Sequence, residues 1–230
     1  MLSLTPEEIT AILLSLKVAA VAMAGSLPFG IAVAWLLARR NFPGKALVDA
    51  LVHLPLILPP VVTGYTLLLL FGRKGLVGGW LGDHLGIVFA FRWTGAALAC
   101  AVMGFPLLVR AIRLSIEGID RRLESAAGTL GAAPALVFLT VTLPLMLPGI
   151  LAGMVLSFAR AFGEFGATIT FVSNIPGETQ TLPTAIYVFT QVPGGDAQAL
   201  RLALIAVAIA VSALIVSEFF ARRVAKRVRG

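Results

Sequence analysis

The feature that most limits the fold of this 230-residue sequence is a series of five long apolar segments. They cover about residues 9–38, 51–71, 87–109, 135–158 and 200–220. A helix that spans a bilayer needs about 20 mostly apolar residues, so each segment is long enough to cross. Only 13% of the residues are charged, against about 25% in soluble domains. The sequence therefore predicts an all-α integral membrane protein with one domain, residues 1–230.

Basic residues set the expected orientation of these spans. Three Lys or Arg lie in the first connection, four in the third and five in the C-terminal tail, of 18 in the chain. With five spans, all three regions fall on one side, which the positive-inside rule assigns to the cytoplasm. The N-terminus, the 73–84 connection and the 173–198 region are then expected outside.

The N-terminal residues favour a helix start. Thr5 suits the N-cap, Pro6 the first helical position, and Glu8 the closing position of a capping box. A cleaved signal peptide is a poor alternative, because it needs a basic N-terminal region and this one is acidic.

Two further regions depart from simple spans. Residues 163–198 are rich in Gly, Pro and Thr, and include a short apolar piece, 182–190, that we interpret as a re-entrant or interfacial helix. The segments LPLILPP at 54–60 and LPLMLPG at 143–149 echo each other at the expected cytoplasmic entrance of a span. The shared prolines indicate either paired bends in a common path or a coincidence of composition.

Several classes of function are excluded by what the sequence lacks. No nucleophile with a base, no metal-ligand cluster and no phosphate-binding GxxxxGK[ST] loop is visible, so we expect no catalytic residue, no metal site and no ATP hydrolysis by this chain. The basic residues are not interleaved with stacking aromatics, which argues against nucleic acid as a partner. The single cysteine, Cys100, is expected to be a core residue.

The central stretch, about residues 119–135, predicts a helical elbow on the cytoplasmic side. Four apolar residues recur there at helical spacing: Ile119, Leu123, Ala126 and Leu130. Asp120 stands near the helix start, glycines at 128 and 131 loosen the chain, and Pro134 suits the start of a second helix. An ordinary connecting loop is the alternative.

The same stretch resembles the EAA motif of permease subunits of binding-protein-dependent ABC importers. AAGTLG at 126–131 is followed after nine residues by VTLP at 141–144. The positions that match are Ala126, Ala127, Gly131, Leu143 and Pro144. Ser125 stands in the place of the acidic residue, with Glu124 one position earlier. The resemblance implies that the elbow docks on an ATPase subunit, and it leaves open which of these two makes the acidic contact.

A second candidate site follows at the end of the fourth span. Arg160 and Glu164 are four residues apart and can pair on one helix face; ionisable residues at membrane depth are functional candidates, although a helix-end salt bridge at the interface is the alternative. The segment from 158 to 189 resembles the molybdate branch of these importers. Weak donors suit an anion path, and the candidates here are Thr168, Thr170, Ser173 and Asn174; these residues could equally bond neighbouring helices.

The resemblance implies a MetI-like importer-permease fold of about five transmembrane helices in the bacterial cytoplasmic membrane, with the N-terminus outside. It implies a homodimer, two ATPase subunits that carry ATP and Mg, and an external oxyanion-binding protein, with no cofactor on this chain. Molybdate is the expected cargo, and tungstate or sulfate/thiosulfate are alternatives. An ion-gradient-driven transporter would instead need mid-membrane carboxylates, and an intramembrane hydrolase a catalytic constellation.

Overall fold

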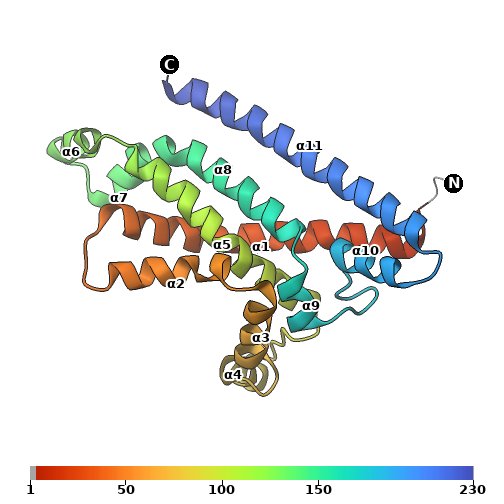
Figure 1. Ribbon diagram of the computed structural model, residues 1–230. Coiled ribbons are helices and arrows are strands. Elements are labelled where there is room, and N and C mark those ends of the chain that lie inside the picture. Colours follow the sequence, from red (N-terminus) through yellow and green to blue (C-terminus); the bar gives the residue numbers. More distant parts are fainter. Residues whose placement is uncertain (1–3, 230) are drawn as a thin grey trace.

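The computed structural model describes residues 4–229, and this range is helical, with no strand (Figure 1). The longer helices are α1 (Pro6–Arg39), α2 (Lys45–Ile57), α3 (Pro60–Phe71), α5 (Trp93–Glu117), α8 (Leu143–Phe162) and α11 (Asp196–Arg229). The shorter ones are α4 (Leu76–Leu85), α6 (Arg121–Thr129), α7 (Pro134–Val137), the π-helical turn η1 (Phe138–Thr142), α9 (Gly166–Val172) and α10 (Leu182–Gln191). The side chains of residues 217, 218 and 220–229 lie outside the described part, and with them the basic C-terminal residues.

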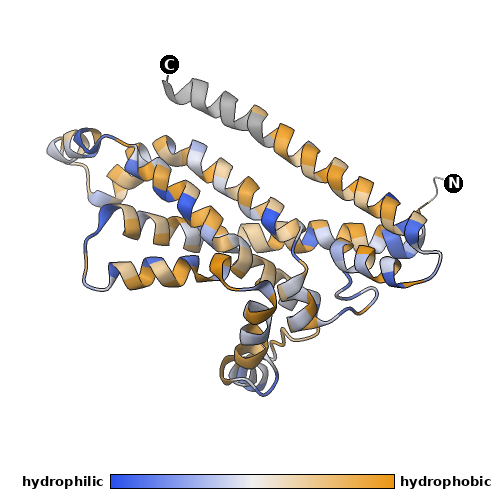
Figure 2. Ribbon diagram, viewed as in Figure 1, coloured by the Kyte–Doolittle hydropathy of each residue, from blue (hydrophilic) through white to orange (hydrophobic). Residues whose placement is uncertain are grey.

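Helices α1, α5 and α8 lie side by side and form the body of the chain, and α11 runs along α8 (Figure 1). The α1–α2 connection and α6 lie together at one end, and the N-terminus and α10 lie at the other (Figure 1). The long helices are apolar along most of their length, and the hydrophilic residues gather near their ends (Figure 2). This arrangement agrees with the sequence, in which most charged residues lie between the long apolar segments.

The start of α1 confirms the predicted capping box. The Thr5 side chain accepts a hydrogen bond from the backbone N–H of Glu8, and the Glu8 carboxylate accepts one from the N–H of Thr5 at 2.7 Å. The other Glu8 oxygen binds Arg201 of α11, with Nη2 at 2.6 Å. The first turn of α1 is therefore tied to the first turns of α11 as well as capped.

The core is divided into two buried clusters along the body. One surrounds Cys100 and Met103 of α5 together with Phe171 of α9. The other surrounds Ile112 and Ile116 of α5 near the elbow end. Cys100 is 1% exposed, and its thiol donates to the backbone oxygen of Ala161, so it is a core residue as expected.

The second predicted span is not one straight helix. Four segments among the described residues are long and apolar enough to cross a membrane, namely Pro6–Arg39, Trp93–Glu117, Pro134–Phe162 and Asp196–Val216. A fifth is obtained if α2 and α3 are one span, but they meet at 115°. Leu58 and Pro59 both have extended backbone, because a residue before proline is pushed out of the helical region.

The two similar proline-containing segments, 54–60 and 143–149, adopt different structures. LPLILPP contains the break between α2 and α3. The 13 residues of α2 separate this break from the α1–α2 connection. LPLMLPG lies inside α8, where Pro148 is accommodated without ending the helix. Of the two interpretations of the echo, coincidence of composition is therefore the one that the structure favours.

The third predicted span is displaced along the chain. Helix α5 covers Trp93–Glu117, instead of the predicted 87–109. It begins late because Gly86 and Phe91 have positive φ and interrupt the backbone before Arg92. It ends late because Arg113, in its last turns, bonds Glu117 of the same helix and Asp49 of α2.

The region 163–198 contains two short helices joined by a turn-rich connection. The short apolar piece becomes α10, which packs on α1 and α11, and the backbone N–H of Leu182 donates to Ser15 of α1 at 2.6 Å. Helix α9 packs mainly on α3, where Gly64 faces the backbone of Ala167 so closely that no β-carbon would fit. The breaks α2/α3 and α8/α9 therefore lie close together.

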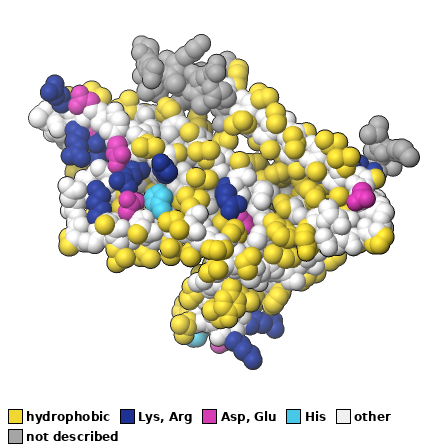
Figure 3. Space-filling model, in the orientation of Figure 1, with side chains coloured by type: hydrophobic (Ala, Val, Ile, Leu, Met, Phe, Trp, Pro, Cys, Tyr) yellow, Lys and Arg dark blue, Asp and Glu magenta, His cyan; other side chains and the backbone are white. Residues whose placement is uncertain are grey.

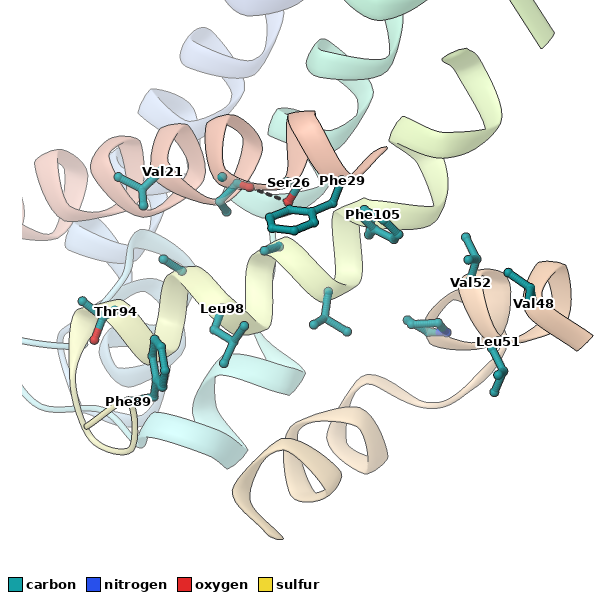
Figure 4. A pocket seen from close by; sticks show the side chains of 16 residues that line it. Val21, Ser26, Phe29, Val48, Leu51, Val52, Phe89, Thr94, Leu98 and Phe105 are labelled. Carbon is teal, nitrogen blue, oxygen red and sulfur yellow. Dashed lines mark hydrogen bonds between the residues drawn. The ribbon is translucent and has the colours of Figure 1, made fainter. Parts of the chain in front are cut away.

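A large apolar groove of about 750 Å³ lies between α1, α2 and α5 (Figure 4). Its walls include Val21, Leu51 and Phe105, and the hydroxyl of Ser26 is already bonded to Ala22 of its own helix at 2.6 Å. Because a charge is costly to bury without polar partners, this groove is a poor place for an oxyanion.

Candidate functional site

The predicted elbow is present as two helices joined by a tight turn. Asp120 caps α6, its carboxylate accepting from the N–H of Arg122 at 2.9 Å. The helix ends at Thr129 with Leu130 as its C-cap, and Gly131 then adopts φ +86°, a left-handed conformation that favours glycine. Helix α7 begins at Pro134, as predicted, and continues through η1 into α8.

The apolar stripe predicted for the elbow divides between the core and the surface. Ile119, just before α6, is buried in the second core cluster. Leu123 and Leu130 are instead 50% and 89% exposed. Leu136 and Leu139, in α7 and η1, are also more than half exposed. The elbow therefore presents apolar side chains at the charged end of the molecule, which Figure 3 shows dotted with arginine and acidic residues.

Glu124 points into the molecule. Its Oε1 lies 3.1 Å from Nη2 of Arg39, the last residue of α1, and accepts a hydrogen bond from Thr142 of η1 at 2.7 Å. The same guanidinium reaches the backbone oxygen of Ile119 at 3.5 Å. The side chains of Arg39 and Glu124 are 10% and 22% exposed, so one carboxylate joins three segments in a partly buried setting.

The other residues of the predicted coupling set lie on both faces of the elbow. Ser125, Ala126 and Gly131 are exposed, and the Ser125 hydroxyl donates to the backbone oxygen of Arg121 at 3.1 Å. Ala127 is half-buried. Leu143 and Pro144 are half-buried at the start of α8, with Leu143 packed against the second core cluster.

A cavity of about 440 Å³ separates α6 from the end of α1. Trp35 and Arg40 line it on the α1 side, and Ser125 and Gly128 on the side of α6. Glu124 and Arg39 lie at its margin, so their ion pair bridges a space that side chains do not fill.

The second predicted site is an ion pair at the break between α8 and α9. Arg160 Nη1 lies 2.5 Å from Glu164 Oε2, and the Glu164 side chain is 1% exposed. The other carboxylate oxygen accepts from the backbone N–H of Ala167 at 2.8 Å and caps α9. The positive charge of Arg160 is therefore compensated by a carboxylate that the N-terminus of α9 holds in place.

The four predicted anion donors are not gathered around one point. Thr168 donates to the backbone oxygen of Phe165 at 2.9 Å, and Thr170 to that of Gly166 at 2.8 Å. A hydroxyl has one proton to donate, so these two offer an anion no free donor in this conformation. Ser173 is exposed and has φ +63°, and the side-chain oxygen of Asn174 is buried without a partner among the described residues.

Arg39 and Thr142 are the residues that the sequence did not single out. Thr142 lies within the VTLP segment, so its position between two motif residues was a usable signal. Arg39 is 85 residues from Glu124, and no spacing rule connects the two.

Comparisons with known proteins agree with this geometry. The family described as "Binding-protein-dependent transport system inner membrane component" matches residues 26–230. The chain belongs to this family. It is therefore an inner-membrane component of a binding-protein-dependent transport system, and the chain spans the membrane.

Relatives of known name extend the match over nearly the whole chain. The chain is 61% identical to the molybdenum transport system permease protein ModB of Escherichia coli (strain K12), over 95% of this chain and 96% of the relative. It is 58% identical to ModB of Haemophilus influenzae, over 96% of each. A probable sulfate transport system permease protein of Nephroselmis olivacea is 37% identical, over 79% of this chain and 64% of that protein.

Solved structures of ABC importers share the fold. The bacterial alginate ABC transporter, in complex with an alginate pentasaccharide-bound periplasmic protein, superposes with a TM-score of 0.75 at 18% identity, over 96% of this chain and 80% of that one. The MetNI methionine ABC transporter, in an inward-facing conformation, gives a TM-score of 0.73 at 15% identity, over 94% and 95%. The fold is therefore the MetI-like permease fold of ABC importers.

Proposed function

We propose that this chain is the membrane permease of an ATP-driven importer for molybdate. The observation that carries the proposal is the 61% identity to a molybdenum transport permease along both chains, with no unmatched domain of any size. Identity to the sulfate permease is lower and covers less of either chain. Tungstate and sulfate or thiosulfate remain the alternative cargoes, because tetrahedral dianions differ little in shape.

The permease works as a homodimer, with two ATPase subunits on the cytoplasmic face and an oxyanion-binding protein outside. The exposed leucines of the elbow support an ATPase partner there, because apolar side chains gathered at a polar end indicate a protein contact. The solved alginate importer with its periplasmic protein supports the external partner. ATP and Mg are held by the ATPase, and this chain carries no catalytic residue.

Transport proceeds by alternating access. Closure of the ATPase pair draws the two elbows together and opens the permease outward, so that the binding protein releases its anion; hydrolysis and reopening then return it inward. The ligand must leave as readily as it enters, so the path needs weak contacts. The compensated charge of Arg160 fits this need, because an unpaired buried arginine would hold a dianion strongly.

Reconstitution tests the proposal. The chain is placed in liposomes with its ATPase and binding protein, and uptake of labelled molybdate, tungstate and sulfate is followed with and without ATP. We expect ATP-dependent uptake with molybdate preferred. Movement of molybdate down its gradient through the chain alone, without ATPase, would refute the importer and favour a channel or secondary transporter.

A further inference from the structure

We propose that Glu124 and Arg39 form a clamp that makes α1 move with the elbow. In this assignment Glu124 is a positioning residue that faces its own chain, and the exposed face of the elbow makes the contact with the ATPase. The inference rests on the proposed function, since it concerns how the elbow passes on the motion of the ATPase.

The geometry of the carboxylate supports the clamp. One oxygen of Glu124 is shared between the Arg39 guanidinium at 3.1 Å and the Thr142 hydroxyl at 2.7 Å. Charge-assisted hydrogen bonds of this kind are stronger than neutral ones, and partial burial reduces their screening by salt. Glu124 thus holds α1 and η1 at once, while Ser125, one residue on, is exposed.

The cavity beside the clamp explains why the ion pair carries the connection. The space of about 440 Å³ between α6 and the end of α1 leaves little side-chain packing there. An edge-to-face contact of Trp35 with Phe138, whose ring centroids lie 6.5 Å apart, joins α1 to η1 one turn further back. Between α1 and α6 itself, the polar bridge is the contact that can transmit a displacement.

Because of where α1 lies, the clamp offers a second route by which motion of the elbow can reach the body of the permease. The elbow is joined covalently to α8 through α7 and η1, and this is one route for motion. Helix α1 packs along both α5 and α8, so a force applied at its end acts on the body of the permease. With the clamp closed, the elbow moves α1 and α8 together; with it broken, the elbow can shift while α1 stays behind.

A double-mutant cycle in the reconstituted importer tests the clamp. Arg39→Met removes the positive charge, and Glu124→Gln keeps the shape and still accepts from Thr142. The measured quantity is the number of ATP molecules hydrolysed per molybdate taken up. We expect each single variant to raise it about tenfold and the double variant to raise it no further, because both single variants remove the same charge pair. Lys45→Met, which deletes a basic side chain at the start of α2, should leave the ratio unchanged.

Two results would overturn the clamp. Single-variant effects that multiply in the double variant would show that the two residues act independently. Loss of ATPase co-purification in Glu124→Gln, with Arg39→Met unaffected, would show that Glu124 contacts the ATPase instead. Failure of the wild-type chain to show ATP-dependent uptake would count against the proposed function and not against the clamp.

A distance measurement adds a readout that is independent of transport. Spin labels at Asn41→Cys and Thr129→Cys, both exposed positions, report the separation between the end of α1 and α6. Cys100 is buried and does not compete for label. We expect the separation to stay constant between the resting and ATP-bound complexes of the wild type, and to change with ATP in Glu124→Gln. A separation that changes equally in both would contradict the clamp.

Discussion

The contact between α5 and α8 depends on Gly149, which faces α5 at very close range. A β-carbon at this position would overlap the β-carbon of Ser115, lie 2.7 Å from its hydroxyl oxygen, and lie 3.0 Å from the backbone oxygen of Ala111. The hydroxyl oxygen can rotate away, but the Ser115 β-carbon and the Ala111 backbone oxygen cannot. Gly149→Ala should therefore force the helices apart.

The expected change in the free energy of unfolding for Gly149→Ala is the sum of two opposing effects. Overpacking a tight contact costs about 1–3 kcal/mol, and the rigid partner at Gly149 places this variant at the upper end. In the opposite direction, replacing glycine by alanine within a helix stabilises the fold by about 1 kcal/mol. The net expectation for Gly149→Ala is a loss of about 2 kcal/mol. Gly25→Ala is the matched control, because nothing lies within 4 Å of its β-carbon, and there only the helical gain remains.

Ser115→Gly supplies the compensating change. It removes the two side-chain atoms that the new methyl group meets. In the double variant, the gain in helix propensity at residue 149 and the loss at residue 115 roughly cancel. We expect Gly149→Ala with Ser115→Gly to lie within about 1 kcal/mol of the wild type. The assay is the thermal midpoint of the detergent-solubilised complex, where about 2 kcal/mol corresponds to roughly 4–8 °C in a chain of this size. The reasoning is refuted if Gly149→Ala is as stable as Gly25→Ala, or if Ser115→Gly gives no relief.

Three other perturbations have defined outcomes. Arg201→Met leaves the carboxylate of Glu8 buried and unpaired, so the thermal midpoint should fall by an amount equal to about 2 kcal/mol, with recovery when Glu8→Met is added. Gly131→Val strains a left-handed turn and should keep ATP hydrolysis while reducing uptake, whereas Gly131→Asn, which tolerates that conformation, should transport normally. Arg160→Met leaves the buried carboxylate of Glu164 without its ion-pair partner and should lower the thermal midpoint more than Glu164→Gln, which keeps an acceptor for the N–H of Ala167. Equal effects of these two variants would contradict the burial of Glu164.

The length and polarity of the apolar segments predicted the helical architecture because hydropathy reports what a bilayer requires. Hydropathy does not report where the backbone bends inside an apolar run. The break between α2 and α3 needed a local rule instead, namely that residues before proline are pushed into extended conformation. Pro59 and Pro60 stand together in the sequence, so the break was open to prediction, but the same rule would not have supplied its angle of 115°.

The candidate sites show the same limit. Arg160 and Glu164 are paired, as their spacing in the sequence predicted, but Glu164 lies just past the end of α8, so the pair spans the break and does not lie on one helix face. Asp120 caps α6 for an equally local reason. The partner of Glu124 was not visible, because the position of Arg39 depends on how α1 lies against the elbow. Local rules therefore identified the side chains, and tertiary packing decided which way Glu124 faces.

The break inside the second span and the break that follows α8 have a common mechanical meaning. Lipid gives helices little hydrophobic reason to associate, so close packing through small residues holds them together. Gly149 provides such contact between α5 and α8, and Gly64 provides it between α3 and α9. Helix α8 is thus fixed to the body, α9 is fixed to α3, and the two breaks lie next to each other. If the elbow displaces α8 as proposed, that displacement would change the angle between α8 and α9 at Gly163 or carry α9 and α3 along with α8.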